Sequence, residues 1–529
     1  MKKSDEYYES QKPDDEPIRE PIDGADFVDM IDPFLFRKKY PALFAQTFPG
    51  TVKIRQGTPI IANEYILVDD EPTLQFMSNR GKFRLEVVVG ELRNPLIEVE
   101  KYRFCGGKAV VLISSENALD SLYDLPLGEE IRAVPESGGE PGYIKPGGQG
   151  TYGTGQDGNT NTVGKGQDGN TNTVGKGQDG NTNTVGKGQG YPNAYGFIYP
   201  GSQTTDEERQ VRVKLEGTNS NLKIAVLDSG IWYKDVPTDT PSAQTTQTSC
   251  YELETGWDFV SDDPDPDDEH LNRHGTRIAG IIRRVCPEAT LIPVRISNAQ
   301  NVCTLYDVLC GLEYAAQQRV QLINASWVFS STQGTYIPLL QASLRRLAFR
   351  GIIVVCAAGN IGPVQPGDLD EIPHIGQSKG GKNVPFLSPA CSSEELENVI
   401  TVTSVGQVPD KRKLPANSQR SGQGMKRAVC ELRSRRFVTV GVLVNGDDQA
   451  NHFGSFQTPK MNAFRGTSFA APYVTGLIAN AMQGRADLSS RKDILRAIGA
   501  LRDPDLSEQI CRGMWIEAVL PPDESRVTE

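Results

Sequence analysis

The chain has 529 residues, enough for two to four domains of ordinary size. Its 67 acidic and 55 basic residues give a formal net charge of −12, which is too acidic for a general nucleic-acid-binding protein. Nine cysteines, an odd number without CxxC spacing, argue against a zinc site and a complete disulfide framework, and they favour a reducing compartment. The N-terminus lacks the apolar run of a secretory signal, and no stretch approaches the ~20 apolar residues of a membrane span. We therefore expect a cytoplasmic protein with neither a nucleic-acid nor a membrane partner.

Two segments open the chain. Residues 1–32 are acidic and polar, and we expect them to be disordered. Residues 33–136 are expected to form a small N-terminal domain, β-rich or α+β, because short runs rich in β-branched residues recur along them. The predicted strands are 51–55, 64–68, 83–89, 97–104 and 109–114, and a short helix is predicted at 117–123.

A glycine-rich repeat comes next. An eleven-residue unit, GQDGNTNTVGK, begins at Gly155, Gly166 and Gly177. The Gly and Asn content excludes a helix. A β-solenoid is disfavoured because three copies with one apolar residue each cannot build a core. We therefore interpret residues 137–204 as a flexible linker that is open to proteolytic cutting.

The remaining segment, residues 205–529, alternates apolar strands with helices. This alternation predicts an α/β fold with a doubly wound, mostly parallel sheet and helices on both faces. The predicted strands are 222–227, 290–295, 322–325, 352–357 and 399–405, and the predicted helices are 276–284, 305–319, 338–350 and 468–482.

Four glycine-bearing blocks within this segment each contain one residue suited to nucleophilic catalysis. They are VLDSG with Asp228, HGTRIAG with His274, AAGN with Asn360 and GTSFAAP with Ser468. Each residue alone is commonly structural, since an Asp after a strand or a Ser before a helix is often a cap. The order Asp, His, Asn, Ser across four blocks indicates a catalytic set.

From about residue 215 to about residue 500 the chain resembles the subtilisin-like serine proteases, the subtilases. The resemblance implies a triad in which Ser468 attacks the scissile carbonyl, His274 transfers the proton and Asp228 orients the imidazole. It also implies that Asn360 donates a hydrogen bond to the oxyanion. The local sequence suits these roles, because Asp228 ends a strand, His274 opens a helix and Ser468 begins another helix, whose N-terminus favours negative charge.

The resemblance also implies a substrate-binding strand at Ser326, Trp327 and Val328. A peptide would add to this edge as an antiparallel strand, held by main-chain hydrogen bonds. Subtilases usually have Gly where this chain has Val328, so we expect a narrowed or reshaped pocket for the residue before the scissile bond.

An acidic run at 262–269 precedes His274 and resembles the kexin and furin branch, whose members cut after paired basic residues. Two features depart from that branch. Ser229 stands where those enzymes carry a second acid, and only 61 residues follow Ser468, which leaves little room for their C-terminal β-rich domain. The run could select basic substrates, form a calcium-binding loop or be a solvated loop.

The expected function is that of a serine endopeptidase acting on protein or peptide substrates, without a cofactor for the chemistry and with structural calcium as an option. The alternative is a catalytically silent binding protein with the same fold. Because an unrestrained protease in the cytoplasm would damage its host, we expect narrow specificity and latency. Subtilases often carry an inhibitory prodomain, so the N-terminal domain is a candidate intramolecular inhibitor or, equally, an accessory domain.

Overall fold

In the computed structural model, residue contacts divide the chain into two units. Unit 1 comprises residues 1–9, 50–53 and 60–194, and unit 2 comprises residues 10–49, 54–59 and 195–529. The structure describes residues 7–8, 32–48, 52–68 except 56, strands between 83 and 174, 186–198, 212–233, 256–331 except 269 and 271, 337–360, 374–409 except 380 and 381, 425–444 except 430, and 466–518 except 484–487 and 489.

Unit 1 is built from antiparallel strand pairs. Strand β3 pairs with β8 and with the first part of β12, and β9 pairs with β12 and with β4. The helix expected at 117–123 lies outside the described residues. The strand bounds are β1 Tyr7–Tyr8, β2 Val52–Arg55, β3 Thr58–Val68, β4 Phe83–Val89, β5 Leu92–Arg93, β6 Ile97–Val99, β7 Lys101–Phe104, β8 Val110–Ser114, β9 Glu130–Pro135, β10 Asn161–Lys165, β11 Thr171–Val174 and β12 Gly186–Ile198.

Unit 2 contains a sheet in the order β14-β15-β13-β17-β19-β23-β25-β27-β26, with β24 on β23. The pairs from β14 to β27 are parallel, whereas β26 and β24 pair antiparallel with their neighbours. The bounds are β13 Asn219–Asp228, β14 Trp257–Asp258, β15 Ala289–Arg295, β17 Leu322–Ala325, β19 Ile353–Ala357, β23 Val399–Pro409, β24 Met425–Val429, β25 Val440–Val444, β26 Leu501–Arg502 and β27 Met514–Ala518.

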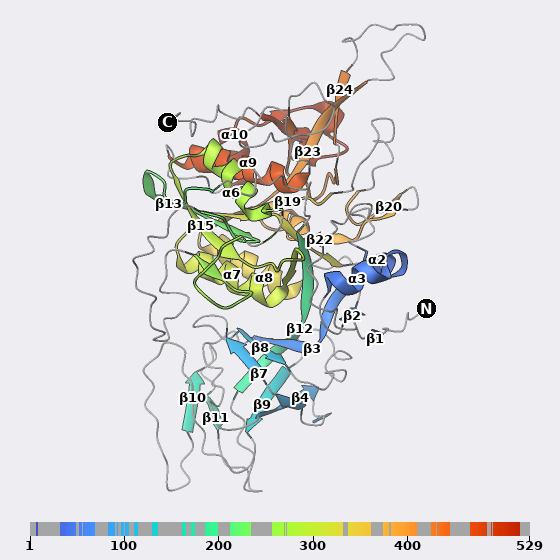
Figure 1. The fold of residues 1–529 in the computed structure, drawn as a ribbon, viewed down its shortest axis with the longest axis vertical. Helices are drawn as coiled ribbons and strands as arrows, with labels where there is room; N and C mark the ends of the chain where they lie inside the picture. Colours follow the sequence, from blue (N-terminus) through green and yellow to red (C-terminus); the bar gives the residue numbers. More distant parts are fainter. Residues whose placement is uncertain are drawn as a thin grey trace. The chain divides into compact units, whose positions relative to one another are not determined.

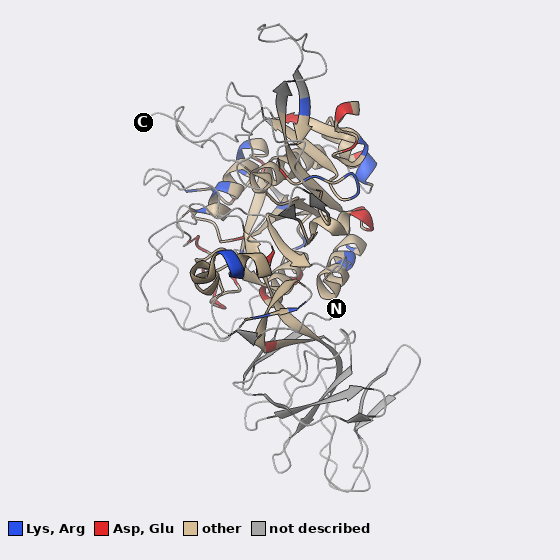
Figure 2. Ribbon diagram, turned by 90° about the vertical axis from the view of Figure 1, so that its right-hand side faces the viewer, with Lys and Arg blue, Asp and Glu red and all other residues tan. Residues whose placement is uncertain are grey.

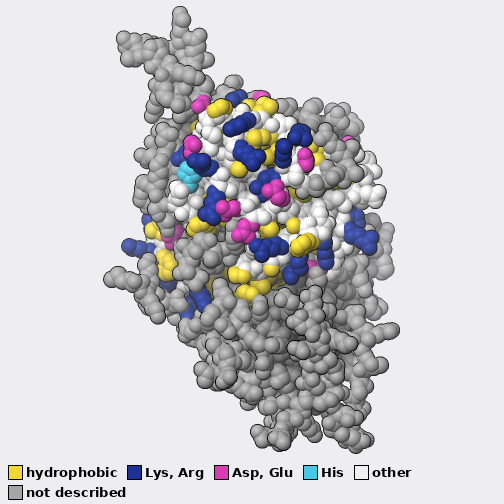
Figure 3. Space-filling view, turned by 180° about the vertical axis from the view of Figure 1, so that it is seen from behind, with side chains coloured by type: hydrophobic (Ala, Val, Ile, Leu, Met, Phe, Trp, Pro, Cys, Tyr) yellow, Lys and Arg dark blue, Asp and Glu magenta, His cyan; other side chains and the backbone are white. Residues whose placement is uncertain are grey.

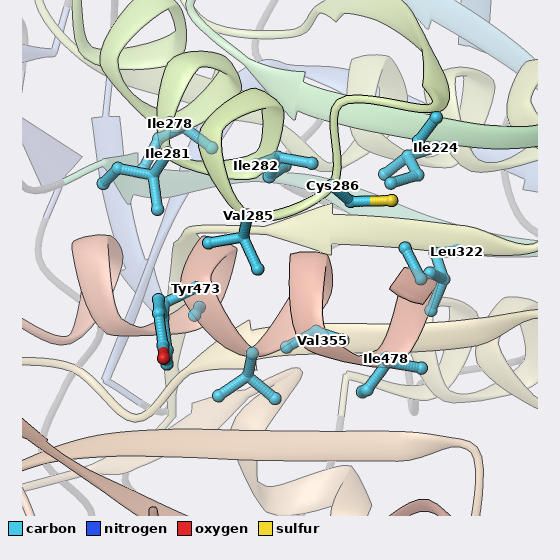
Figure 4. Packing of buried hydrophobic residues seen from close by; sticks show 14 of the residues in the cluster. Ile224, Ile278, Ile281, Ile282, Val285, Cys286, Leu322, Val355, Tyr473 and Ile478 are labelled. Carbon is cyan, nitrogen blue, oxygen red and sulfur yellow. The ribbon is translucent and has the colours of Figure 1, made fainter. Parts of the chain in front are cut away.

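Helices cover both faces of this sheet, so the predicted mostly parallel α/β fold is confirmed (Figure 1). Helices α6 (His274–Val285) and α9 (Thr467–Gln483) pack together on one face, and α7 (Leu305–Gln317) and α8 (Pro338–Phe349) lie on the other. Between α6, α9 and the sheet lies a buried core that includes Ile224, Ile282, Val355 and Ile478 (Figure 4). Burying such side chains supplies the main favourable free energy of folding.

Several shorter elements of unit 2 carry no strong sequence pattern. They are α2 (Pro33–Lys39), α3 (Pro41–Thr47), α10 (Arg491–Ala497), β16 (Val302–Thr304), β18 (Trp327–Ser331), β20 (Ser378–Lys379), β21 (Lys382–Asn383), β22 (Phe386–Ser388) and the 3₁₀ helices η3 (Ala390–Glu394), η4 (Pro504–Leu506) and η5 (Cys511–Gly513).

Two segments that precede the catalytic blocks in the sequence, residues 32–48 and 195–198, belong to unit 2. Helices α2 and α3 group with the sheet, and so do residues 195–198 at the end of β12. These parts meet in an aromatic cluster formed by Phe36, Phe44, Phe48, Tyr195 and Phe197. Residues 186–198, which the sequence analysis assigned to the linker, therefore form a strand, and its last four residues pack in unit 2.

Charged side chains are scarce in the central strands, which Figure 2 shows almost entirely in tan. On the face shown in Figure 3, basic and acidic side chains are interspersed rather than gathered into a patch of one sign. No helix among the described residues is both long and apolar enough to cross a membrane.

Candidate active site

The residues expected to act in catalysis follow strands that end at one edge of the parallel sheet. Asp228 is the last residue of β13, and Ser326 directly follows β17. Asn360 follows β19 after two residues. The strands are aligned in register, with Leu227 opposite Ala325 and Ala325 opposite Cys356. Since parallel strands bring their carboxyl ends together, this edge is the place where an α/β fold forms its site.

Asp228 and His274 form a buried hydrogen-bonded pair. The Nδ1 atom of His274 lies 2.7 Å from Oδ1 of Asp228, and both side chains have no exposed surface. The backbone N–H of Ser229 donates to the same carboxylate oxygen at 2.8 Å. Gly275 permits the close approach, because a Cβ there would lie 2.1 Å from the carbonyl oxygen of Gly230. The carboxylate can therefore hold one tautomer of the imidazole, with the proton on Nδ1.

Ser468 lies in the first turn of α9 and is buried, with 2% of its surface exposed. Its carbonyl oxygen accepts a hydrogen bond from Oγ of Ser326 at 3.0 Å. The same hydroxyl accepts from Nδ2 of Asn324, whose Oδ1 accepts from Oγ1 of Thr475. This network connects the end of β17 to two turns of α9, so the position of Ser468 relative to the sheet edge is constrained.

Asn360 is held against the residues that precede Ser468. Its Oδ1 accepts from the N–H of Thr467 at 2.7 Å and from Oγ1 of Thr467 at 3.1 Å. Gly466 has φ +118°, and a Cβ there would lie 2.9 Å from Oδ1 of Asn360. Because the amide oxygen accepts both of these bonds, the NH₂ group of Asn360 is the part left to donate to another acceptor.

The two halves of the site meet at α9. The ring of Phe469, the residue after Ser468, lies 5.3 Å from the ring of His274 between centroids. The Nε2 atom of His274 is buried and makes no hydrogen bond to any described residue. The structure thus brings all four predicted residues to one edge of the sheet, with the imidazole oriented and its second nitrogen uncommitted.

Asp268 is a second buried carboxylate beside this pair, and the sequence analysis did not assign it a role of its own. Its Oδ1 accepts from Oγ of Ser229 at 3.0 Å and from the N–H of His270 at 3.2 Å. Its Oδ2 accepts from the N–H and the Oγ1 of Thr276, at 2.9 and 2.7 Å. Burial raises the pKa of Asp268 to about 6, and nearby Asp228 adds to the rise, whereas the bonds from Thr276 and Ser229 oppose it.

This carboxylate connects the end of β13 to the first turn of α6. Thr276 lies two residues after His274, and Ser229 follows Asp228. The Oγ of Ser229 also accepts the N–H of Gly275 at 2.9 Å, so two N–H groups at the start of α6 are capped from outside the helix. An acidic run in the sequence contained this residue, but the run alone could not distinguish a buried cap from a solvated side chain.

The other acids near this loop are partly engaged within the protein. Oδ2 of Asp258 pairs with Nη1 of Arg295 at 2.9 Å, and Oδ1 of Asp263 accepts the N–H of Asp265 at 2.9 Å. Among the described residues, no group of three or more His, Cys, Asp or Glu side chains is arranged to hold a metal ion. Asp368, Asp370 and Glu371, a second acidic group in the sequence, lie outside the described residues.

The predicted substrate-binding strand pairs with a segment of the chain itself. Ser326 precedes β18, which contains Trp327 and Val328, and these two pair antiparallel with Ile198 and Phe197. On the other side of this segment lies β16, which pairs antiparallel with Tyr195, Gly196 and Phe197. The sequence analysis missed this strand, although the aromatic residues from Tyr191 onward are a change in composition after the glycine-rich repeats.

The comparison with protein families agrees with the geometry. The model described as "Subtilase family" matches residues 219–501. The "Major intracellular serine protease" of Bacillus subtilis (strain 168) is 27% identical over 271 residues, which are 49% of this chain and 67% of that protein. The "Thermophilic serine proteinase" of Bacillus sp. (strain AK1) is 28% identical over 288 residues, which are 52% of this chain and 56% of that protein.

Among solved structures, the chain is similar to one described as "Structural basis of subtilase cytotoxin SubAB assembly". The identity is 16% and the TM-score 0.37, and the match covers 59% of this chain and 90% of that chain.

Proposed function

Since the chain belongs to the subtilase family of serine peptidases, we propose that it is an endopeptidase that uses Ser468, His274 and Asp228 as a catalytic triad. The observation that carries the proposal is the buried 2.7 Å contact between Asp228 and His274 at the edge where α9 presents Ser468. Asp228 orients the imidazole, and Nε2 of His274 takes the proton of the Ser468 hydroxyl and returns it to the leaving amine.

The negative charge that forms on the substrate carbonyl oxygen is stabilised by two kinds of donor. One is the NH₂ group of Asn360, whose oxygen is held by Thr467. The other is the N-terminus of α9, where the first backbone N–H groups lack partners within the helix. Loss of one oxyanion donor costs about 10² to 10³ in turnover, so Asn360→Ala should lower kcat by that factor.

The test of the activity is hydrolysis of casein by the full chain and by Ser468→Ala. We expect the substitution to lower turnover by roughly 10⁶, because the nucleophile and the proton relay act as a unit. Ser507, a partly exposed serine that follows η4, provides the control, and Ser507→Ala should leave the rate unchanged. If the full chain and Ser468→Ala are equally inactive under all conditions that release the substrate edge, the protein is a binding protein with this fold.

We further propose that the full chain is latent because residues 195–198 take the place of a substrate strand. Their antiparallel pairing with β18 and β16 supports this regulation. The N–H of Ile198 also donates to the carbonyl oxygen of Asn301 at 2.8 Å. A peptide substrate that needs the same edges must therefore displace this strand first.

The aromatic cluster packs on residues 195–198 and holds them in place. The ring of Phe48, which is fully buried, lies 5.1 Å from Tyr195 and 5.2 Å from Phe197 between centroids. Removing a buried Phe side chain typically costs about 3 to 5 kcal/mol, and here the loss falls on the docking of α3 against the strand. Phe48→Ala should therefore raise the rate of casein hydrolysis by the full chain.

A matched control is Phe349→Ala, because the Phe349 side chain is 91% exposed and contributes little packing. Its rate should equal that of the unmodified chain. Equal rates for Phe48→Ala and Phe349→Ala would contradict latency through this strand.

Three further proposals rest on the sequence. A preference for basic residues, suggested by the similarity to the kexin and furin branch, has as candidate contacts the exposed Asp262 and Asp265, because Asp258 and Asp268 are engaged internally. A second proposal is that the protein binds structural calcium, in which case a chelator should lower its thermal stability.

A third proposal is a cytoplasmic location, which is tested by fractionation of cells that express the chain.

A further inference from the structure

Residues 195–198 indicate the shape of the subsites that a substrate strand would meet. They lie between two strands, with Gly196 opposite Cys303 of β16 and Phe197 opposite Val328 of β18. Side chains alternate between the two faces of a strand, so Tyr195 and Phe197 share one face and Gly196 points to the other. The inference about these subsites rests on the proposed function, in which the edges of β16 and β18 bind the substrate.

The two faces of this strand differ in the space that they leave for a side chain. Tyr195 and Phe197 are 4% and 2% exposed, and both rings pack on Phe48. That face accommodates two large aromatic side chains.

The position of Gly196 leaves no room for a side chain. A Cβ there would lie 2.8 Å from Cε1 and Cζ of Phe329 and 2.9 Å from Sγ of Cys303. These distances are shorter than van der Waals contact between such atoms. Gly196 is not among the residues with positive φ, so its backbone does not require glycine and the restriction is one of space.

The neighbours that close this position are themselves packed in place. Phe329 has no exposed surface, and its ring packs edge-on against Trp327 at 5.8 Å between centroids. Cys303 is 1% exposed and comes from the opposite strand, β16. Because β16 and β18 each contribute one wall, a side chain could enter only if both strands or their buried side chains moved.

We propose that this peptidase selects substrates with glycine at the position that pairs with Cys303, and that Phe329 and Cys303 are the specificity-determining residues that enforce it. The glycine is a requirement of shape, because Phe329 and Cys303 occupy the space that a side chain would need.

The proposal is tested with internally quenched peptides that carry the sequence of residues 193–203, NAYGFIYPGSQ, in which the position of Gly196 is Gly, Ala, Val or Leu. Hydrolysis is measured with the full chain and with Phe48→Ala, in which the substrate edge is expected to be open. The Gly peptide should have a kcat/KM about tenfold above the Ala peptide and about a hundredfold above the Val and Leu peptides, because overpacking a closed site has a cost of this size.

Two variants check that the walls cause the selection. Phe329→Ala should bring the Ala and Val peptides to within about threefold of the Gly peptide. Cys303→Ala is the milder change and should raise hydrolysis of the Ala peptide alone, which keeps the test valid if Phe329→Ala does not fold. Both substitutions leave Ser468, His274 and Asp228 unchanged.

The outcomes separate this proposal from the proposed function. Equal hydrolysis of the Gly, Ala and Val peptides, or discrimination that persists in both wall variants, would overturn glycine selection while leaving the peptidase activity intact. Hydrolysis of casein without hydrolysis of any peptide in the series would overturn it as well, since the strand would then not mark the substrate path. If neither casein nor any peptide is cut, the proposed function itself fails.

Discussion

At the scale of single residues, the candidate site depends on side chains besides the four predicted ones. Thr467 uses both its N–H and its hydroxyl to hold the amide oxygen of Asn360. Asp268 accepts four hydrogen bonds, and the two hydroxyls among its donors also accept, from the N–H groups of Gly275 and Trp232. With both hydroxyls donating, Asp268 accepts four hydrogen bonds at once, and an ionised carboxylate has the acceptor sites for all of them.

Ionisation of Asp268 should appear in the pH dependence of activity. Its pKa is raised to about 6, so acidification through this pH adds a proton and the four donors can no longer all be accepted. The groups that act on its pKa are the charge of Asp228 from β13 and the hydrogen bonds from Thr276 of α6 and from Ser229. We therefore expect kcat/KM to decline as the pH is lowered through about 6.

We expect Asp268→Asn to lower kcat/KM at pH 8 by roughly ten- to hundredfold, because the amide can accept on one side only and α6 shifts slightly. The decline of kcat/KM near pH 6 should be weaker in this variant. Asp505→Asn, which changes an exposed carboxylate in η4, is the control and should keep both the rate and the decline. An unchanged decline in Asp268→Asn would show that this carboxylate does not titrate with the activity.

At the scale of elements, the contact between α6 and α9 determines whether His274 and Ser468 meet. Gly476 in α9 lies against Val285 in α6, where a Cβ would be 2.6 Å from the Cβ of Val285. Both helices also contribute to the same core over the sheet. A larger residue at 476 would separate the helices and, with them, the two halves of the site.

Gly476→Val should therefore destabilise the fold by about 2 kcal/mol and lower activity, since the Cβ of Val285 cannot rotate out of the way. The free energy of unfolding in urea measures the first effect, and casein hydrolysis measures the second. The double variant with Val285→Ala should recover part of both, because the two sites are in direct contact. Strictly additive losses would mean that the two helices do not press on each other here.

At the scale of the whole molecule, the segments that pack near β16 and β18 come from both sides of the glycine-rich repeats in the sequence. Residues 32–48 and 57–59 precede the repeats, and residues 195–198 follow them. Besides the aromatic cluster, Oγ1 of Thr58 donates to the carbonyl oxygen of Ser330 at 2.6 Å, and Oγ of Ser330 donates to that of Gly57 at 3.2 Å. These contacts, and not the covalent connection through the repeats, therefore hold the segments together.

A cut within the repeats should consequently leave the protein latent. A specific protease site inserted after Lys176 can be cleaved in the purified chain, and we expect the two fragments to coelute on size exclusion without a gain in casein hydrolysis. The same cut in the Phe48→Ala chain should increase the rate further. A large rise in activity on cutting the otherwise unmodified chain would contradict this view.

The fold class and the candidate residues could be predicted from sequence because their signals are local. The strand predicted at 322–325 matches β17, the helix predicted at 305–319 ends two residues earlier in the structure, and each of the four glycine-bearing blocks is a short run of consecutive residues. Helix α6 was located to within a few residues for the same reason. Tertiary packing set the remaining boundaries, which depend on neighbours distant in the chain.

The tertiary structure alone decided how distant segments meet. The burial of Asp268, the seating of residues 195–198 between β16 and β18 and the closed position beside Gly196 all join residues that lie far apart in the sequence. No local pattern encodes those contacts, because their free energy comes from surfaces that only the folded chain brings together. By itself the sequence determined the family, the candidate residues and the order of the elements in unit 2; the packing determined which side chains hold those residues in place and which segments lie against β16 and β18.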